Sequence, residues 1–134
     1  EIVKRHNELE NKTLKSLYVG GGTPSVLSVD ELKSIMDEIQ KYFSFDPEIE
    51  ITLESNPDDL NQKFLKEISN TEINRLSIGT QSFFDEDLKF MNRAHSSSEA
   101  ESSIKRAQDC GFENITIDLI YGSPVSGFEI WKEN

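Results

Sequence analysis

Short strand-like apolar runs alternate with amphipathic segments along this chain, and that alternation limits the folds open to it. The strand-like runs are residues 17–19, 48–54, 75–79 and 114–120, and residues 1–11 read as the tail of a polar helix. Consecutive strands separated by helices pair in parallel through right-handed crossovers. No repeat, linker or low-complexity tract divides the 134 residues. The sequence therefore predicts one α/β domain with a parallel sheet.

Capping residues mark where the helices begin. Residues 28–31 form a capping box, in which a serine hydroxyl and a glutamate carboxylate satisfy free amides. The apolar residues that follow recur at three- and four-residue spacing, as one buried stripe of Val29, Leu32, Ile35, Met36, Ile39 and Phe43. Asn56-Pro57 predicts a second helix start, with Asn as cap and Pro at the first helical position. Residues 96–99 offer another capping box, before a helix that stops at Gly111.

The strand faces favour a barrel over a flat sheet. Each of the last three strands has one apolar face and one face of small or polar residues, the latter comprising Thr52, Glu54, Arg75, Ser77, Gly79, Gln81, Thr116 and Asp118. A doubly wound sheet carries helices on both faces, so its strands are usually apolar on both. An ordinary eight-stranded barrel fills its interior with branched side chains. We therefore expect part of an open, TIM-barrel-like (β/α) barrel with a ligand in its lumen.

Candidate binding groups collect where the strands end. They are the loop Gly20-Gly21-Gly22-Thr23-Pro24, Glu54, Gln81 and Asp118, with Arg93 in a later loop. Active sites of parallel barrels form at this end. Successive glycines let backbone amides meet a ligand, carboxylates accept from ribose hydroxyls or an ammonium group, and a guanidinium binds a carboxylate. The set suits an amino acid joined to a nucleoside.

Each of these motifs also has a purely structural interpretation. The glycine run is also typical of a simple turn. Asp118 has a second reading as a helix cap, and Glu54 as the partner of a lysine. Arg93 and His95 lie in a loop, where charged residues are usually solvated. The combination at four strand ends is what favours a binding site.

Composition excludes several classes of protein. The formal net charge of −11 argues against a nucleic-acid surface, and no apolar run approaches the length of a membrane span. The single cysteine, Cys110, rules out an internal disulfide and any multi-cysteine metal site built from this chain alone. It also fits a reducing, cytoplasmic location.

Five motifs resemble, in order and spacing, those of the oxygen-independent coproporphyrinogen III oxidase family of radical S-adenosylmethionine (SAM) proteins. They are Tyr18–Ser25, Glu50–Pro57, Asn74–Phe83, Asn92–His95 and Ile117–Pro124, and the resemblance runs from about Leu17 to Trp131. It implies a radical SAM barrel in which a [4Fe–4S] cluster cleaves SAM to a 5′-deoxyadenosyl radical. By the family pattern, Gly21, Gly22 and Thr23 hold the methionyl part, Glu54, Gln81, Arg93 and Asp118 contact SAM, and Ile120 lies near the adenine.

The chain lacks the Cys-x3-Cys-x2-Cys segment that the family carries upstream of the first strand. Without three thiolates no cluster is held, so no metal ligand is assigned here. Because the sequence also opens on Glu1, we expect residues 1–134 to be the central part of a radical SAM core. A barrel fragment exposes an unpaired strand at each edge of its sheet. We therefore expect these edges to pair with a second copy of the chain or with flanking segments of the longer protein.

Two branches of the family fit the remaining residues. The resemblance implies SAM and a porphyrinogen or haem as partners, and an oxidoreductase of porphyrin biosynthesis as the parent activity. The Arg-x-His at Arg93 to His95 resembles the branch of haem chaperones, which deliver haem without oxidising coproporphyrinogen. A nucleotide-binding domain unrelated to SAM would instead carry Gly-x-Gly-x-x-Gly after a strand, and the chain has none.

Overall fold

The computed structural model of the chain describes residues 2–5, 8 and 13–134. Four strands, β1 (Thr13–Val19), β2 (Ser44–Ser55), β3 (Arg75–Gln81) and β4 (Asn114–Leu119), alternate with helices. The helical segments are α1 (Ile2–Arg5), η2 (Pro24–Val26), α2 (Val29–Gln40), η3 (Pro57–Asp59), α3 (Gln62–Ile68), α4 (Asp85–Phe90), α5 (Ser97–Asp109) and α6 (Phe128–Trp131). The predicted α/β class is confirmed.

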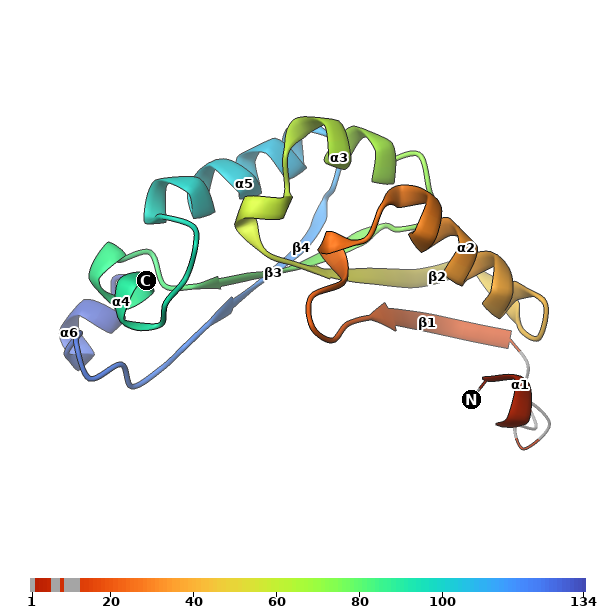
Figure 1. The fold of residues 1–134 in the computed structure, drawn as a ribbon, viewed down its shortest axis with the longest axis horizontal. Helices are drawn as coiled ribbons and strands as arrows, with labels where there is room; N and C mark the ends of the chain where they lie inside the picture. The colour runs from red at the N-terminus through yellow and green to blue at the C-terminus, as the bar shows by residue number, and fades with distance from the viewer. Residues whose placement is uncertain (1, 6–7, 9–12) are drawn as a thin grey trace.

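The strands form one parallel sheet in the order β1-β2-β3-β4, so each strand pairs with its neighbour in sequence. Helices α2, α3 and α5 lie along one face of this sheet, and the other face carries no helix in the described part of the chain (Figure 1). An all-parallel sheet covered on one face is the geometry of a barrel segment, because a flat parallel sheet is covered on both. The barrel expectation is confirmed for these four strands.

The helices bury the apolar side of the sheet. Fully buried Ile51, Leu53, Leu76 and Ile78 alternate along the central strands and face the helices, as the period of two requires. The helix stripes complete this core with Leu32, Met36, Leu65, Ile68 and Ala107. Of the stripe predicted on α2, only Ile35 is substantially exposed, at 39%. The predicted Ser28–Glu31 capping box is present in both of its bonds.

Polar side chains cross-link the opposite face near the amino ends of the strands. Arg75 donates from Nη1 to Glu50 Oε1 at 3.1 Å and from Nη2 to Thr116 Oγ1 at 2.5 Å. One guanidinium therefore joins three adjacent strands and has its charge compensated by Glu50. We call Arg75 with Glu50 and Thr116 the guanidinium strap.

Two predicted helix starts are wrong in detail. Asn56 does not cap a long helix: Pro57 opens the three-residue turn η3, and α3 begins only at Gln62, capped by Asn61. The side chain of Asn56 is used elsewhere, as described below. Before α5, Ser96 caps the amide of Glu99, but the Glu99 carboxylate pairs with Arg106 and does not return to the cap.

Of the polar helix predicted over residues 1–11, the structure shows α1, and residues 1, 6–7 and 9–12 lie outside the described part. No helix among the described residues has both the length and the apolar character needed to cross a membrane.

Candidate functional site

The glycine loop after β1 contacts the end of β2. Gly21 N donates to Glu54 Oε2 at 3.3 Å. A side chain at position 20 has no room, since a Cβ there would lie 2.7 Å from Glu54 Oε2 and 2.6 Å from the Tyr18 ring. Gly21 has φ +133°, a backbone conformation natural only to glycine. Gly20 thus lets the Glu54 carboxylate approach the loop, and Gly21 lets the chain turn. A Cβ at Gly21 or Gly22 would meet only open space.

The end of β3 is irregular, and the irregularity sets the direction of Gln81. The register with β4 passes from Ile78 opposite Ile117 to Gln81 opposite Leu119, so β3 has one residue more than its partner. Such a bulge bends the strand and redirects the side chains after it. Gln81 takes φ +67°, and its amide nitrogen would lie 2.8 Å from a Cβ placed at Gly79. The Gln81 side chain therefore covers Gly79, and a side chain at position 79 would have to displace the Gln81 amide.

Asp118 lies on the polar face of β4, one strand from Ser77. Its Oδ2 accepts a 3.1 Å hydrogen bond from the Ser77 hydroxyl, and the residue is exposed. Neither structural alternative raised for the two carboxylates applies, because Asp118 caps no helix and Glu54 accepts from a backbone amide. Both carboxylates keep an oxygen that accepts no hydrogen bond from the described residues.

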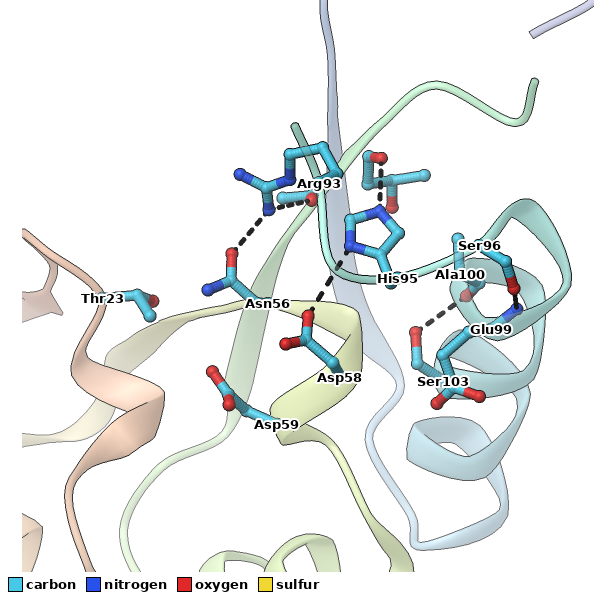
Figure 2. Close-up of polar contacts among 12 residues, drawn as sticks. Thr23, Asn56, Asp58, Asp59, Arg93, His95, Ser96, Glu99, Ala100 and Ser103 are labelled. Carbon is cyan, nitrogen blue, oxygen red and sulfur yellow. Dashed lines mark hydrogen bonds and ion pairs between the residues drawn. The ribbon is translucent and has the colours of Figure 1, made fainter. Parts of the chain in front are cut away.

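Arg93 reaches the same strand ends from the loop after α4. Its Nη2 donates to Asn56 Oδ1 at 2.7 Å and to the Gly79 carbonyl at 3.1 Å (Figure 2). Nη1 and Nε make no hydrogen bond to the described residues, so two donors of the guanidinium fork remain for a ligand. Arg93 is half-buried and fixed, and the interpretation as a merely solvated charge is wrong.

The turn η3 connects the loops that carry these groups. Asp59 Oδ2 accepts from Ser25 Oγ at 2.6 Å, and Ser25 Oγ in turn accepts from Asn56 N at 3.3 Å. These bonds tie η3 to the segment just after Thr23, while the Asn56 side chain holds Arg93. Thr23 itself directs its hydroxyl towards Ser25, 3.3 Å away. One short turn therefore positions both the glycine loop and the guanidinium.

Ile120 follows β4 and is 45% exposed, as is suitable for a surface that packs against a ligand. Its amide donates to the Gln81 carbonyl at 2.9 Å. The next loop is held by Asp87, a buried carboxylate of α4 whose Oδ1 accepts from Ser123 at 2.5 Å and whose Oδ2 accepts from Ser82 at 3.1 Å. Burial raises the pKa of Asp87, but hydrogen bonds from serine hydroxyls, led by Ser123, outweigh it and hold that pKa below its usual range.

Most of the predicted site residues thus converge. The structure joins Gly21 to Glu54, Gln81 to Ile120, and Arg93 to the end of β3; Asp118 lies beside Ser77, and Gly22 and Thr23 complete the loop. The supporting residues Ser25, Asn56 and Asp59 escaped the sequence reasoning. Asn-Pro is typical of helix starts and therefore predicts a cap at Asn56. The spacing of apolar residues says nothing about a side-chain hydrogen bond to a residue far along the chain.

The interpretation of His95 as a solvated loop residue is also wrong. Its side chain has 0% exposure, its Nε2 lies 3.0 Å from the Thr80 carbonyl, and its Nδ1 lies 3.6 Å from Asp58 Oδ1 (Figure 2). A solvated histidine was expected; a buried one is found.

An iron–sulfur cluster does not fit the chain's own residues. Cys110 follows α5 and precedes β4, so it lies at the amino end of the sheet, away from the polar strand ends. The described residues contain no group of three His, Cys, Asp or Glu side chains arranged to hold a metal ion. The donor set at the strand ends, by contrast, suits an amino acid joined to a nucleoside.

Comparisons with known proteins point the same way. The family model described as the radical SAM superfamily matches residues 1–132. The heme chaperone HemW of Lactococcus lactis is 36% identical over 133 residues, which cover 99% of this chain and 35% of that protein. HemW of Bacillus subtilis is 41% identical over 112 residues, covering 83% of this chain and 30% of that protein. The chain spans about a third of the length of these relatives.

Solved structures agree with the sequence comparison. Coproporphyrinogen III oxidase (HemN) from Escherichia coli, described as a radical SAM enzyme, superposes with a TM-score of 0.85 at 30% identity, covering 98% of this chain and 30% of that one. The Elp3 protein of Methanocaldococcus infernus superposes with a TM-score of 0.72 at 20% identity, covering 96% of this chain and 34% of that one. The second likeness shows the shared fold alone.

Proposed function

The chain belongs to the radical SAM superfamily, and we propose that the carboxyl ends of its four strands bind SAM in a protein of haem or porphyrin metabolism. One observation carries the proposal: the glycine loop, Glu54, Asp118 and Arg93 come from separate segments and meet at one edge of the sheet. Taken one at a time, the motifs could be a simple turn, a helix cap or a surface charge. None of these interpretations explains why the groups lie together at one edge of the sheet.

Arg93 is the proposed partner of the SAM carboxylate. Nη2 is held by Asn56 and Gly79, which leaves the Nη1 hydrogens and the Nε hydrogen free to donate charge-assisted hydrogen bonds to a carboxylate. A guanidinium already fixed loses little side-chain freedom when the ligand binds. Gly21, Gly22 and Thr23 face the methionyl part, where the absence of side chains at the glycines leaves room for the ligand backbone.

The other contacts divide between sugar, ammonium group and base. Glu54 and Asp118 offer carboxylate oxygens to ribose hydroxyls or the ammonium group, and the Gln81 amide both donates and accepts. Ile120, exposed beside the end of β4, offers an apolar surface to the adenine. In the family, SAM bound to a [4Fe–4S] cluster supplies a 5′-deoxyadenosyl radical; residues 1–134 would orient SAM, and the cluster thiolates would come from an upstream segment.

Two functions remain for the whole protein. The first is oxidation of a porphyrinogen, as the name of the superposed Escherichia coli structure suggests. The second is haem delivery, which the name shared by several of the similar bacterial proteins suggests. Either setting is compatible with a cytoplasmic protein.

The test uses the full-length protein that carries this sequence, titrated anaerobically with SAM in a calorimeter. We expect one SAM per chain, and after cluster reconstitution we expect release of 5′-deoxyadenosine under reductant that is lost when the upstream cysteines are replaced. Haem binding without decarboxylation of coproporphyrinogen would select the chaperone. A protein that binds no SAM would refute the proposal.

A further inference from the structure

Two carbonyl groups at the end of β3 are contacted by side chains of the loop after α4. The register with β2 ends at Ile78, and in the register with β4 the bulge sets Gly79 and Thr80 opposite the single residue Asp118. The Thr80 carbonyl accepts from the Ser82 amide at 2.8 Å. Arg93 Nη2 donates to the Gly79 carbonyl, and His95 Nε2 lies 3.0 Å from the Thr80 carbonyl. Residues two apart in one loop thus bind successive carbonyls of the bulge.

The geometry also fixes the tautomer of His95. A carbonyl oxygen only accepts, so the hydrogen of this bond resides on Nε2. Nδ1 faces Asp58 Oδ1 at 3.6 Å, beyond hydrogen-bond length, and has no hydrogen-bond partner among the described residues. The ring is enclosed between the end of β3 and η3, with no exposed surface. The Nδ1 lone pair is free, but the ring has no exposed surface, so iron could reach Nδ1 only if the end of β3 and η3 moved apart.

We infer that His95 is a positioning residue that holds the β3 bulge, and through it Gln81 and Arg93, in the geometry that receives SAM; the inference rests on the proposed function. Bulges are held by satisfying the groups they free from the ladder. The Thr80 carbonyl keeps the bond from Ser82 N when His95 is replaced, so what is lost is the tie between the bulge and the loop that carries Arg93. Without that tie, we expect Arg93 and the Gly79 carbonyl that anchors it to shift relative to each other. His95 is therefore assigned to the SAM site and not to haem.

The experiment compares His95→Leu with His95→Gln in the full-length protein. Glutamine places an amide nitrogen near the position of Nε2 and keeps the donor, whereas leucine fills the space without one. We expect SAM affinity by calorimetry to fall about tenfold for His95→Leu and to stay within about threefold of wild type for His95→Gln. Ile39→Ala is the control, because this buried residue near the end of α2 loosens the fold far from the strand ends.

Further measurements separate positioning from general destabilisation and from haem ligation. In an Arg93→Ala background, His95→Leu should cost much less affinity than it does alone, because the two changes act through one contact. The imidazole nitrogen shifts of the wild-type protein should report the Nε2–H tautomer, and the Soret band of the haem-loaded protein should be the same in His95→Gln.

The contrary outcomes are distinct. Equal SAM affinity in His95→Leu and Ile39→Ala, or losses that multiply with Arg93→Ala, would overturn the positioning role while leaving SAM binding intact. A displaced Soret band in His95→Gln would make His95 a haem ligand. A wild-type protein that binds no SAM would overturn this inference together with the proposed function.

Discussion

Ser25 donates a 2.6 Å hydrogen bond to Asp59, and this contact joins the loop after β1 to the turn after β2. Both residues stand next to proposed ligand-binding segments, Ser25 just after Thr23 and Asp59 three residues after Asn56. The bond therefore sets the separation between the glycine loop and the turn that holds Arg93. Loss of this bond should therefore alter the positions of both the glycine loop and the turn η3.

Ser25→Ala removes that bond and the bond from Asn56 N, and it leaves the half-buried Asp59 carboxylate without its donor. We expect the free energy of unfolding to fall by about 1.5–3 kcal/mol, the range for a hydrogen bond to a charged group. Urea unfolding followed by circular dichroism measures it. Ser34→Ala is the matched control, because the Ser34 hydroxyl bonds only to the carbonyl of Asp30 within α2. Equal stability of the two variants would show that the contact does not tie the loops.

Arg93→Ala should weaken SAM binding by about 1.5–3 kcal/mol, because the charged bonds to the ligand carboxylate are lost. Calorimetry on the full-length protein gives the value. Lys89→Ala, an exposed cation on the preceding helix α4, should leave the affinity unchanged. Unchanged affinity in Arg93→Ala would remove this residue from the site.

Gly20→Ala tests the close approach of Glu54 to the glycine loop. The added methyl group meets the Tyr18 ring and the Glu54 carboxylate below 3 Å, so we expect Glu54 to turn away and the Gly21–Glu54 bond to break. Because Gly20 is exposed and the groups it would meet are side-chain ends, the loss of stability should be smaller than the roughly 1–3 kcal/mol of an overpacked core. Gly127→Ala is the control, since a Cβ there meets nothing within 4 Å and the backbone has φ −71°. If both variants bind SAM like wild type and are equally stable, the loop does not need the approach.

The Asp87 carboxylate should make stability pH-dependent in acid. Its pKa in the folded protein lies below the usual value: burial opposes this, but the hydroxyls of Ser123, Ser126 and Ser82 outweigh burial. A lowered folded-state pKa adds stability that is complete above the unfolded pKa of about 3.9 and is lost as the pH falls towards the folded pKa. We expect Asp87→Asn to flatten the urea midpoint against pH below about pH 4. The exposed neighbour variant Glu86→Gln should keep the wild-type slope, and a wild-type slope in Asp87→Asn would refute the assignment.

The free edges of β1 and β4 predict association when residues 1–134 are prepared alone. Each outer strand has one neighbour strand in the described sheet, so residues 14–19 and β4 each present an edge that no other described strand covers. Light scattering over a concentration series should show dimers or larger species. A folded monomer at high concentration would mean that these edges are protected.

Sequence reasoning predicted the elements and the polar face because both depend on local periodicity. The alternation of Thr52 and Glu54 with Leu53, for example, places the carboxylate on the open face whatever the long-range contacts. The fate of Asn56 was not predictable in this way, since its bond to Arg93 joins residues 37 positions apart. His95 was misjudged for the same reason: loop composition says nothing about a carbonyl freed by a bulge in another strand.

The guanidinium strap lies across the strands and divides the polar face into a part towards their amino ends and a part towards their carboxyl ends. Arg75 donates hydrogen bonds to Glu50 and Thr116 near the amino ends of the strands, and the Glu50 carboxylate compensates its charge. A ligand on this face would therefore meet a charge-compensated surface near Arg75, and the open carboxylates of Glu54 and Asp118 from the level of Ser77 onwards. Depth along a strand, and not residue type alone, decides which polar side chains in this lumen are open to recognition and which are structural.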